Sequence, residues 1–283
     1  MKDKQGKLVD MRMSTSEDSW ALNGIGTSNV CELFVIRHGQ TSYNKVHRLQ
    51  GQLDIPLNGE GRAQCKKCGL NVKEMLSSSS SFSSCCFGEG FAAVYSSPLR
   101  RARESAEIIC NEANVPLSLI VEDPRIMEWN AGILQGHYLS DIQRDFPREW
   151  NKWRVARDLD FVVEGGESLR MRYTRVQQFF LEKAALHMGH RILVLTHGGV
   201  MDDLLRLARN LPMDANTRAP KPNAEPNILH AIGNKNARLL SNSEHETLST
   251  EATSLRWQII RWGCLDPSSD TAKNESSIFT EYV

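Results

Sequence analysis

Three short runs of apolar residues stand out along the chain. Each is four or five residues long and rich in Val, Ile, Leu or aromatic side chains, as buried strands are; they cover residues 33–36, 91–95 and 192–195. Segments of helical character separate them, at residues 59–76, 99–113, 168–187 and 200–210. This alternation predicts a single α/β domain with a mostly parallel central sheet that helices cover on both faces.

Polar and serine-rich segments set the expected limits of that domain, residues 30–265. Residues 1–29 are polar and lack apolar periodicity, so we expect a flexible extension there and a second flexible segment in the tail, residues 266–283. The low-complexity residues 77–90 and 241–254 are interpreted as surface insertions. Residues 221–230 and a late strand at 255–262 are expected to close the domain.

Charge and cysteine content limit the classes of partner and the cellular compartment that we expect. The 34 basic and 34 acidic side chains balance, so we expect neither nucleic acid nor a membrane as a partner. No apolar run approaches the roughly 18 residues of a membrane span, and no secretory signal is recognisable. Seven cysteines without a disulfide pattern favour reduced thiols in the cytoplasm, although organellar targeting stays open. The oligomeric state is not predicted.

Histidines follow two of the three apolar runs. The first run ends in Arg37, His38 and Gly39, and the last in His197 and Gly198. Ligands of open α/β sheets bind at the carboxyl ends of strands, so both histidines should reach one crevice if the two strands are neighbours. The glycines allow close approach to a ligand, and the helix that follows offers N-terminal amides to an anion.

Arginines follow the second run, at positions 100, 101 and 103. A guanidinium stays protonated at physiological pH and fits a phosphate in a bidentate manner. Arg37 and one of these three arginines would therefore suffice to hold a phosphoryl group without a metal or cofactor. Two histidines and two arginines at strand ends predict a phosphoryl-transfer site.

Six motifs resemble those of the histidine phosphatase, or phosphoglycerate mutase-like, superfamily, and they occur in the family's order. They are RHGQTSYN at 37–44, LQGQLDIPLNGEG at 49–61, YSSPLRRARESA at 95–106, EWNAGILQG at 128–136, GGES at 165–168 and VLTHGGV at 194–200. The resemblance implies hydrolysis of a small phosphorylated substrate through a phosphohistidine. It assigns catalytic roles to five residues and substrate contacts to three: His38, Arg37, Arg101, His197 and Glu128, and Asn44, Gly51 and Gly198.

The resemblance also assigns the chemistry. His38 is the nucleophile and must be neutral, with its other ring nitrogen donating to an acceptor such as a backbone carbonyl. Arg37, Arg101 and a protonated His197 are expected to counter the phosphoryl charge. Arg101 is chosen over Arg100 because it precedes the alanine of the family pattern. Glu128 is expected to be a carboxylic acid that protonates the leaving group, and a solvated surface charge is its alternative.

The segment at residues 137–163 is expected to be a lid that sets specificity. It lacks the paired arginines of the mutases, so a phosphatase is favoured over a phosphoglycerate mutase, and a weak regulatory protein on the same fold comes third. Its basic side chains still offer a grip on a second acidic group: Arg144, Arg148, Lys152, Arg154 and Arg157. Trp150 and Trp153 either line the pocket or pack on the domain. Cys65 and Cys68 are interpreted as structural because they lie within a helix.

Overall fold

One sheet contains all the strands in the part of the chain that the computed structural model describes, residues 29–77, 90–217, 219–233 and 255–263. Its six strands lie in the order β3-β2-β4-β1-β5-β6. In chain order they are β1 (Val30–Arg37), β2 (Ala93–Ser96), β3 (Ile120–Glu122), β4 (Arg191–Thr196), β5 (Pro226–Ile232) and β6 (Arg256–Arg261).

The sheet is mostly parallel, as predicted. The neighbouring pairs β1–β4, β4–β2 and β2–β3 are parallel, whereas β5 runs antiparallel to both β1 and β6. The three apolar runs correspond to β1, β2 and β4, and the late strand is β6. The sequence did not reveal β3, which is only three residues long and leaves Val121 51% exposed at the edge of the sheet.

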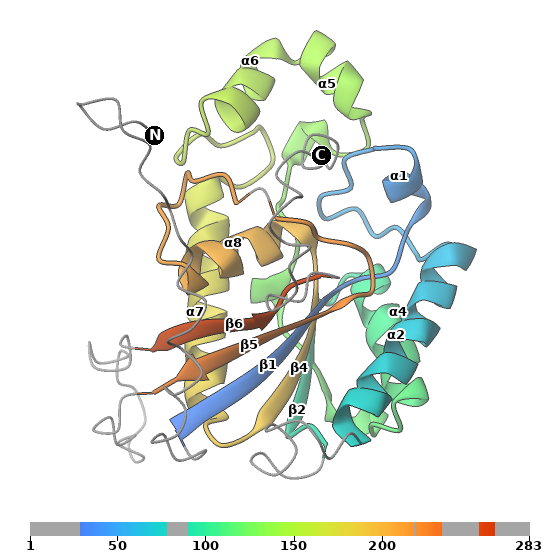
Figure 1. Cartoon of the computed structure of the whole chain (residues 1–283). Coiled ribbons are helices and arrows are strands. Elements are labelled where there is room, and N and C mark those ends of the chain that lie inside the picture. The colour runs from blue at the N-terminus through green and yellow to red at the C-terminus, as the bar shows by residue number, and fades with distance from the viewer. Residues whose placement is uncertain (1–28, 78–89, 218, 234–254, 264–283) are drawn as a thin grey trace, which may run out of the picture.

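Helices cover both faces of the sheet (Figure 1). Side chains alternate along each strand. Leu33 and Val35 of β1 face the helices α7 (Leu169–Leu186) and α8 (Gly198–Ala208), whereas Phe34 and Ile36 face α2 (Gly59–Ser77) and α4 (Arg100–Glu112). Each face thus has its own apolar core, which explains why these strands are apolar throughout rather than alternating.

A third apolar cluster lies beyond the carboxyl ends of the parallel strands, around Trp129 and Leu134. The segment at 137–163 contributes to it and forms α5 (Leu139–Asp145), α6 (Pro147–Trp150) and a π-helical turn (Asn151–Val155), the first two at the top of Figure 1. Trp153 stacks on Trp129, with ring centroids 4.9 Å apart, and Trp150 meets Trp153 edge-on. Both tryptophans therefore pack on the domain, and the role of this segment as a lid stays a prediction.

Short helical turns complete the described fold: α1 (Ser42–Lys45) and the 3₁₀ turns Leu117–Leu119, Pro124–Ile126 and Gly132–Leu134. Most of the segments expected to be extensions or insertions lie outside the described residues, namely 1–28, 78–89, 234–254 and 264–283. Among the described helices, none combines the length and the apolar character that crossing a bilayer requires.

Candidate active site

His38 and His197 lie together at the topological switch point of the sheet, where the helices that follow two neighbouring strands pack on opposite faces. β1 and β4 are adjacent, and the helices that follow them, α2 and α8, lie on opposite faces. The His38 N–H donates to the carbonyl of Thr196 at 2.9 Å, and the rings of His38 and His197 lie 5.2 Å apart, centroid to centroid. Both side chains are buried. The prediction that the strands deliver both histidines to one place is confirmed.

His38 has the environment of a neutral nucleophile. Its Nδ1 lies 2.7 Å from the carbonyl oxygen of Gly39. With the proton on Nδ1, the ring donates to that carbonyl and keeps the Nε2 lone pair for attack. Burial lowers the pKa of His38 well below its ordinary value, and the charges of Arg101 and Arg37 lower it further. Neutral His38 is therefore the dominant form at neutral pH.

Arg101 is fully buried and firmly placed. From the first turn of α4, its Nη1 and Nη2 donate to the carbonyls of Leu53 and Gly51, each at 2.7 Å. Burial lowers the pKa of Arg101 to about 10, which still leaves it a cation at neutral pH. Arg100 is exposed and Arg103 pairs with glutamates on the surface, so Arg101 alone of the three belongs to the site.

Arg37, at the end of β1, completes the cationic pair. Its Nη1 donates to the carbonyl of Lys221 at 2.7 Å. Burial lowers the pKa of Arg37, while the Glu128 and Asp202 carboxylates oppose that shift. Its Nε is buried without a hydrogen-bond partner among the described residues, and the same is true of the Nε of Arg101. The buried Arg101 and the partly buried Arg37 thus each have a buried Nε donor that is not used by the described residues.

His197 is the second buried histidine of the candidate site. Its Nε2 lies 2.8 Å from Ser97 Oγ, and its Nδ1 is buried and unpaired within the described structure. Burial lowers the pKa of His197 well below its usual value, and Arg101, His38 and Arg37 add to the effect. The neutral ring is therefore favoured in the structure described, which contains no phosphoryl group, and the expectation of a protonated His197 in the occupied site stays a prediction. Only an added negative charge, such as that of a bound phosphoryl group, would favour the protonated ring.

Glu128 is brought to the start of α8. Its Oε1 accepts from the N–H of Trp129 at 2.7 Å and its Oε2 from the N–H of Gly199 at 3.0 Å. One amide at the N-terminus of α8, expected to bind an anionic ligand, thus binds this carboxylate. Glu128 therefore lies in the site rather than on an open surface.

The three residues expected to contact substrate take different positions. Asn44 Oδ1 accepts from the N–H and the hydroxyl of Thr41, the N-cap residue of α1. The side-chain amide nitrogen of Asn44 is therefore left to donate to a ligand. Gly51 has a φ of +53° and supports Arg101 through its carbonyl. A Cβ on Gly198 would stand 3.7 Å from Arg37, an ordinary contact. The tight position is Gly199, where a Cβ would stand 2.3 Å from Glu128 Oε1.

Several supporting side chains escaped the sequence analysis. Ser105 accepts from the N–H of Gly39 and donates to the carbonyl of Arg101, so it ties the His38 loop to α4. Asn223 Nδ2 donates to the carbonyl of His38 at 2.7 Å. Arg175 donates to the carbonyl of Glu128 and to the carboxylate of Glu167. Ser105 and Glu167 lie in two of the six family motifs, and this position is the signal by which they could have been found. Asn223 lies in none of these motifs.

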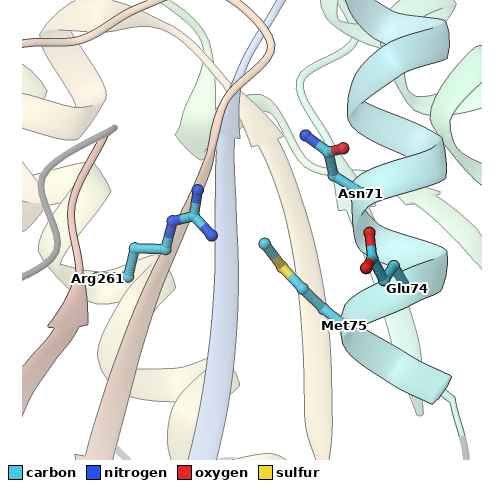
Figure 2. Close-up of a pocket in the computed structure, with 4 residues that line it drawn as sticks. All are labelled: Asn71, Glu74, Met75 and Arg261. Atoms are coloured by element: carbon cyan, nitrogen blue, oxygen red, sulfur yellow. The ribbon is translucent and has the colours of Figure 1, made fainter. Parts of the chain in front are cut away.

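Other candidate chemistry lies elsewhere or is absent from the described residues. No cluster of three or more His, Cys, Asp or Glu side chains suits a metal ion there. Cys65 and Cys68 are free and buried in α2, and burial raises the pKa of both thiols. An open hollow of about 400 Å³ lies between α2 and β6 (Figure 2). Asn71, Glu74, Met75 and Arg261 line it, and none of them is a predicted site residue.

The family model and the relatives that match this chain are of the histidine phosphatase or phosphoglycerate mutase-like kind. The model of the histidine phosphatase superfamily (branch 1) matches residues 33–244. The phosphoglycerate mutase-like protein 4 of Arabidopsis thaliana is 35% identical over 179 residues, which cover 63% of this chain and 71% of that protein. A metal-independent phosphoserine phosphatase of the same plant is 29% identical over 215 residues, or 76% of this chain and 82% of that protein.

A similar solved structure is that of the mycobacterial glucosyl-3-phosphoglycerate phosphatase in complex with VO3. It is 25% identical to this chain, the TM-score is 0.60, and the match covers 82% of this chain and 98% of that one. The relatives that match thus bear names of both phosphatases and mutases.

Proposed function

The chain is an enzyme of the histidine phosphatase superfamily, and we propose that it hydrolyses small phosphate monoesters without a metal, through a phosphohistidine on His38. The observation that carries this proposal is a set of three buried nitrogens without partners in the described structure: Nε of Arg37, Nε of Arg101 and Nδ1 of His197. Buried polar atoms are rarely left unpaired, and these three belong to the side chains around His38. A phosphoryl group would satisfy all three.

The first step transfers the phosphoryl group to His38. Nε2 attacks the phosphorus, a P–N bond forms and the P–O bond to the leaving group breaks. Glu128 gives its proton to the departing alkoxide, for which its carboxyl must first be protonated. Arg37 and Arg101 counter the charge on the equatorial oxygens, where catalysis of phosphoryl transfer mainly lies.

The second step returns the enzyme to its starting state. Glu128, now a carboxylate, accepts a proton from a water molecule that attacks the phosphorus. The P–N bond breaks, inorganic phosphate leaves, and His38 regains its neutral form. Its Nδ1 bond to the carbonyl of Gly39 holds the ring in one tautomer throughout both steps.

A phosphatase fits the segment at 137–163 better than a mutase does. A mutase must hold a second acidic group while the phosphohistidine survives, which needs unengaged cations. Here Arg144 pairs with Asp145, Lys152 pairs with Asp158, and Arg157 donates to the carbonyls of Asp214 and Ala215. Most of the basic side chains in this segment thus already have partners.

The proposed substrates are small phosphomonoesters such as phosphoserine or a sugar phosphate. This is supported by the names of a plant phosphoserine phosphatase and a mycobacterial glucosyl-3-phosphoglycerate phosphatase among similar proteins. A cytoplasmic location is part of the same proposal, and the buried free thiols suit a reducing compartment.

The test is hydrolysis of a panel of phosphomonoesters in EDTA, comparing wild type with His38→Ala. The panel contains phosphoserine, 3-phosphoglycerate, sugar phosphates and p-nitrophenyl phosphate. We expect turnover that EDTA leaves intact and that His38→Ala abolishes. A folded wild-type protein that hydrolyses none of them would favour the mutase or a binding protein instead.

A further inference from the structure

Arg172 is a buried cation that lies beside Glu128 but has no place in the mechanism above. It belongs to α7, and its side chain is 9% exposed. Two of its nitrogens, Nε and Nη2, donate to Asp203 of α8 at 2.6 and 3.1 Å. The third, Nη1, lies 2.8 Å from the position that a Cβ on Gly199 would occupy, and Glu128 Oε1 lies 2.3 Å from the same position. The guanidinium and the carboxylate therefore flank Gly199 together.

Asp203 keeps Arg172 charged and in place. Burial by itself would lower the pKa of Arg172, but the Asp203 carboxylate outweighs burial and Glu128 adds to its effect, so that the pKa is raised. Asp203 also accepts from Nη1 of Arg206 at 2.6 Å. The Asp203 carboxylate thus binds two arginines, and the cluster of these three side chains carries a net positive charge.

Three arginines interact with the Glu128 carboxylate through their charges: Arg37 of β1, Arg101 of α4 and Arg172 of α7. Arg175 of α7 donates to the main-chain carbonyl of Glu128. In the proposed mechanism Arg37 and Arg101 face the phosphoryl group, whose negative charge offsets theirs. Arg172 is held by Asp203 instead. Its charge therefore acts on Glu128 in every state of the reaction cycle.

We propose that Arg172 is a positioning residue that acts through Glu128, because its fixed charge sets the pH at which this carboxyl gives up and regains its proton. Without that charge the carboxyl would hold its proton to higher pH. Proton donation would then persist into alkaline solution, whereas proton removal from water would become slow near neutral pH. The inference rests on the proposed role of Glu128.

The test is the pH profile of kcat/KM for the best alkyl phosphate of the substrate panel, because an alkoxide leaving group needs a proton. Arg172→Gln removes the charge and retains a donor for Asp203. Arg206→Gln is the matched control, since it disturbs the same buried cluster through a side chain that does not flank Gly199. We expect the high-pH limb to move up by about one unit in Arg172→Gln and to stay in place in Arg206→Gln.

Two further variants separate the effect of the Arg172 charge from a general disturbance of the structure. Arg172→Lys keeps the charge and should keep the limb in place. Asp203→Asn removes a negative charge and should move the limb to lower pH, which serves as the test if Arg172→Gln does not fold. A rate that falls equally in Arg172→Gln and Arg206→Gln, with no movement of the limb, overturns the inference.

Glu128→Gln separates this inference from the function itself. If the high-pH limb disappears in Glu128→Gln yet does not respond to Arg172, only the inference on Arg172 fails. If the limb survives in Glu128→Gln, the role of Glu128 as proton donor fails, and the inference on Arg172 fails with it.

Discussion

Gly199 lies against the proposed proton donor and leaves no room for a side chain. A Cβ there would stand 2.3 Å from Glu128 Oε1 and 2.8 Å from Arg172 Nη1. Gly199→Ala should therefore push the Glu128 carboxyl away from the start of α8. Because small displacements of catalytic groups cost about 100-fold in rate, we expect kcat to fall by roughly that factor, measured on the best substrate of the panel.

Gly59→Ala is the matched control for Gly199→Ala. Gly59 likewise lies in the first turn of a helix, α2, and a Cβ there meets nothing within 4 Å. Since alanine favours helix over glycine by up to about 1 kcal/mol, this variant should retain full kcat and unfold at the same or a slightly higher temperature. Equal kcat values for the two variants would show that Glu128 tolerates displacement.

At the scale of elements, the segment that leads into β5 places the loop after β1. Three contacts join them: Asn223 Nδ2 donates to the carbonyl of His38, the N–H of Ala224 donates to the carbonyl of Arg37, and the carbonyl of Lys221 accepts from Arg37. Asp202 of α8 in turn accepts from Lys221 Nζ at 2.7 Å. His38 and Arg37, the proposed nucleophile and one of the two proposed phosphate-binding arginines, are thus held by a distant part of the chain.

Asn223→Ala tests this support. The variant loses one hydrogen bond to the His38 loop, which costs about 1 kcal/mol of stability. We expect kcat to fall about ten-fold through misplacement of His38. Asn71→Ala, in the wall of the hollow of Figure 2, removes the same side chain outside the candidate site and should leave kcat unchanged. Equal kcat values for the two variants would contradict the positioning role.

The elements differ in how readily their sequence predicts them. β1 and β4 were predictable because both faces are buried, and α2, α4, α7 and α8 because their apolar positions recur. β3 was not predictable, because a three-residue strand at the exposed edge of the sheet is too short to show a pattern of apolar and polar positions. At the site, His38, Arg37, Arg101 and His197 follow strands and share known motifs. Asn223 and Arg172 were missed because their contacts arise only when distant segments pack together.

At the scale of the whole molecule, the two buried histidines make stability depend on pH. Burial lowers the pKa of His38 and of His197 well below 6.5, whereas the unfolded chain takes up a proton on each near that pH. Below pH 6.5 the unfolded state therefore binds more protons, and the free energy of unfolding falls as the pH falls. The contribution of the two histidines to stability is fully present above the pKa of the unfolded chain. It decreases as the pH falls from there to the lower pKa of the folded protein.

Urea unfolding at about pH 6.5 and about pH 5.5 measures this effect. Each histidine should contribute about 1 kcal/mol over that interval, so the pair lowers the free energy of unfolding by about 2 kcal/mol. The double variant His38→Asn/His197→Asn should lose this contribution and show a correspondingly shallower pH dependence. An unchanged dependence in the double variant would mean that the two histidines titrate normally in the folded protein.

The phosphohistidine on His38 is the central claim, and the stereochemical course at phosphorus tests it most directly. The measurement is hydrolysis, in water enriched in 17O, of a phosphorothioate monoester made chiral with 16O and 18O, followed by determination of the configuration of the thiophosphate that is released. Two successive in-line transfers, first to His38 and then to water, each invert the phosphorus, so we predict net retention of configuration. Net inversion would mean that water attacks the substrate directly, and it would contradict the covalent intermediate.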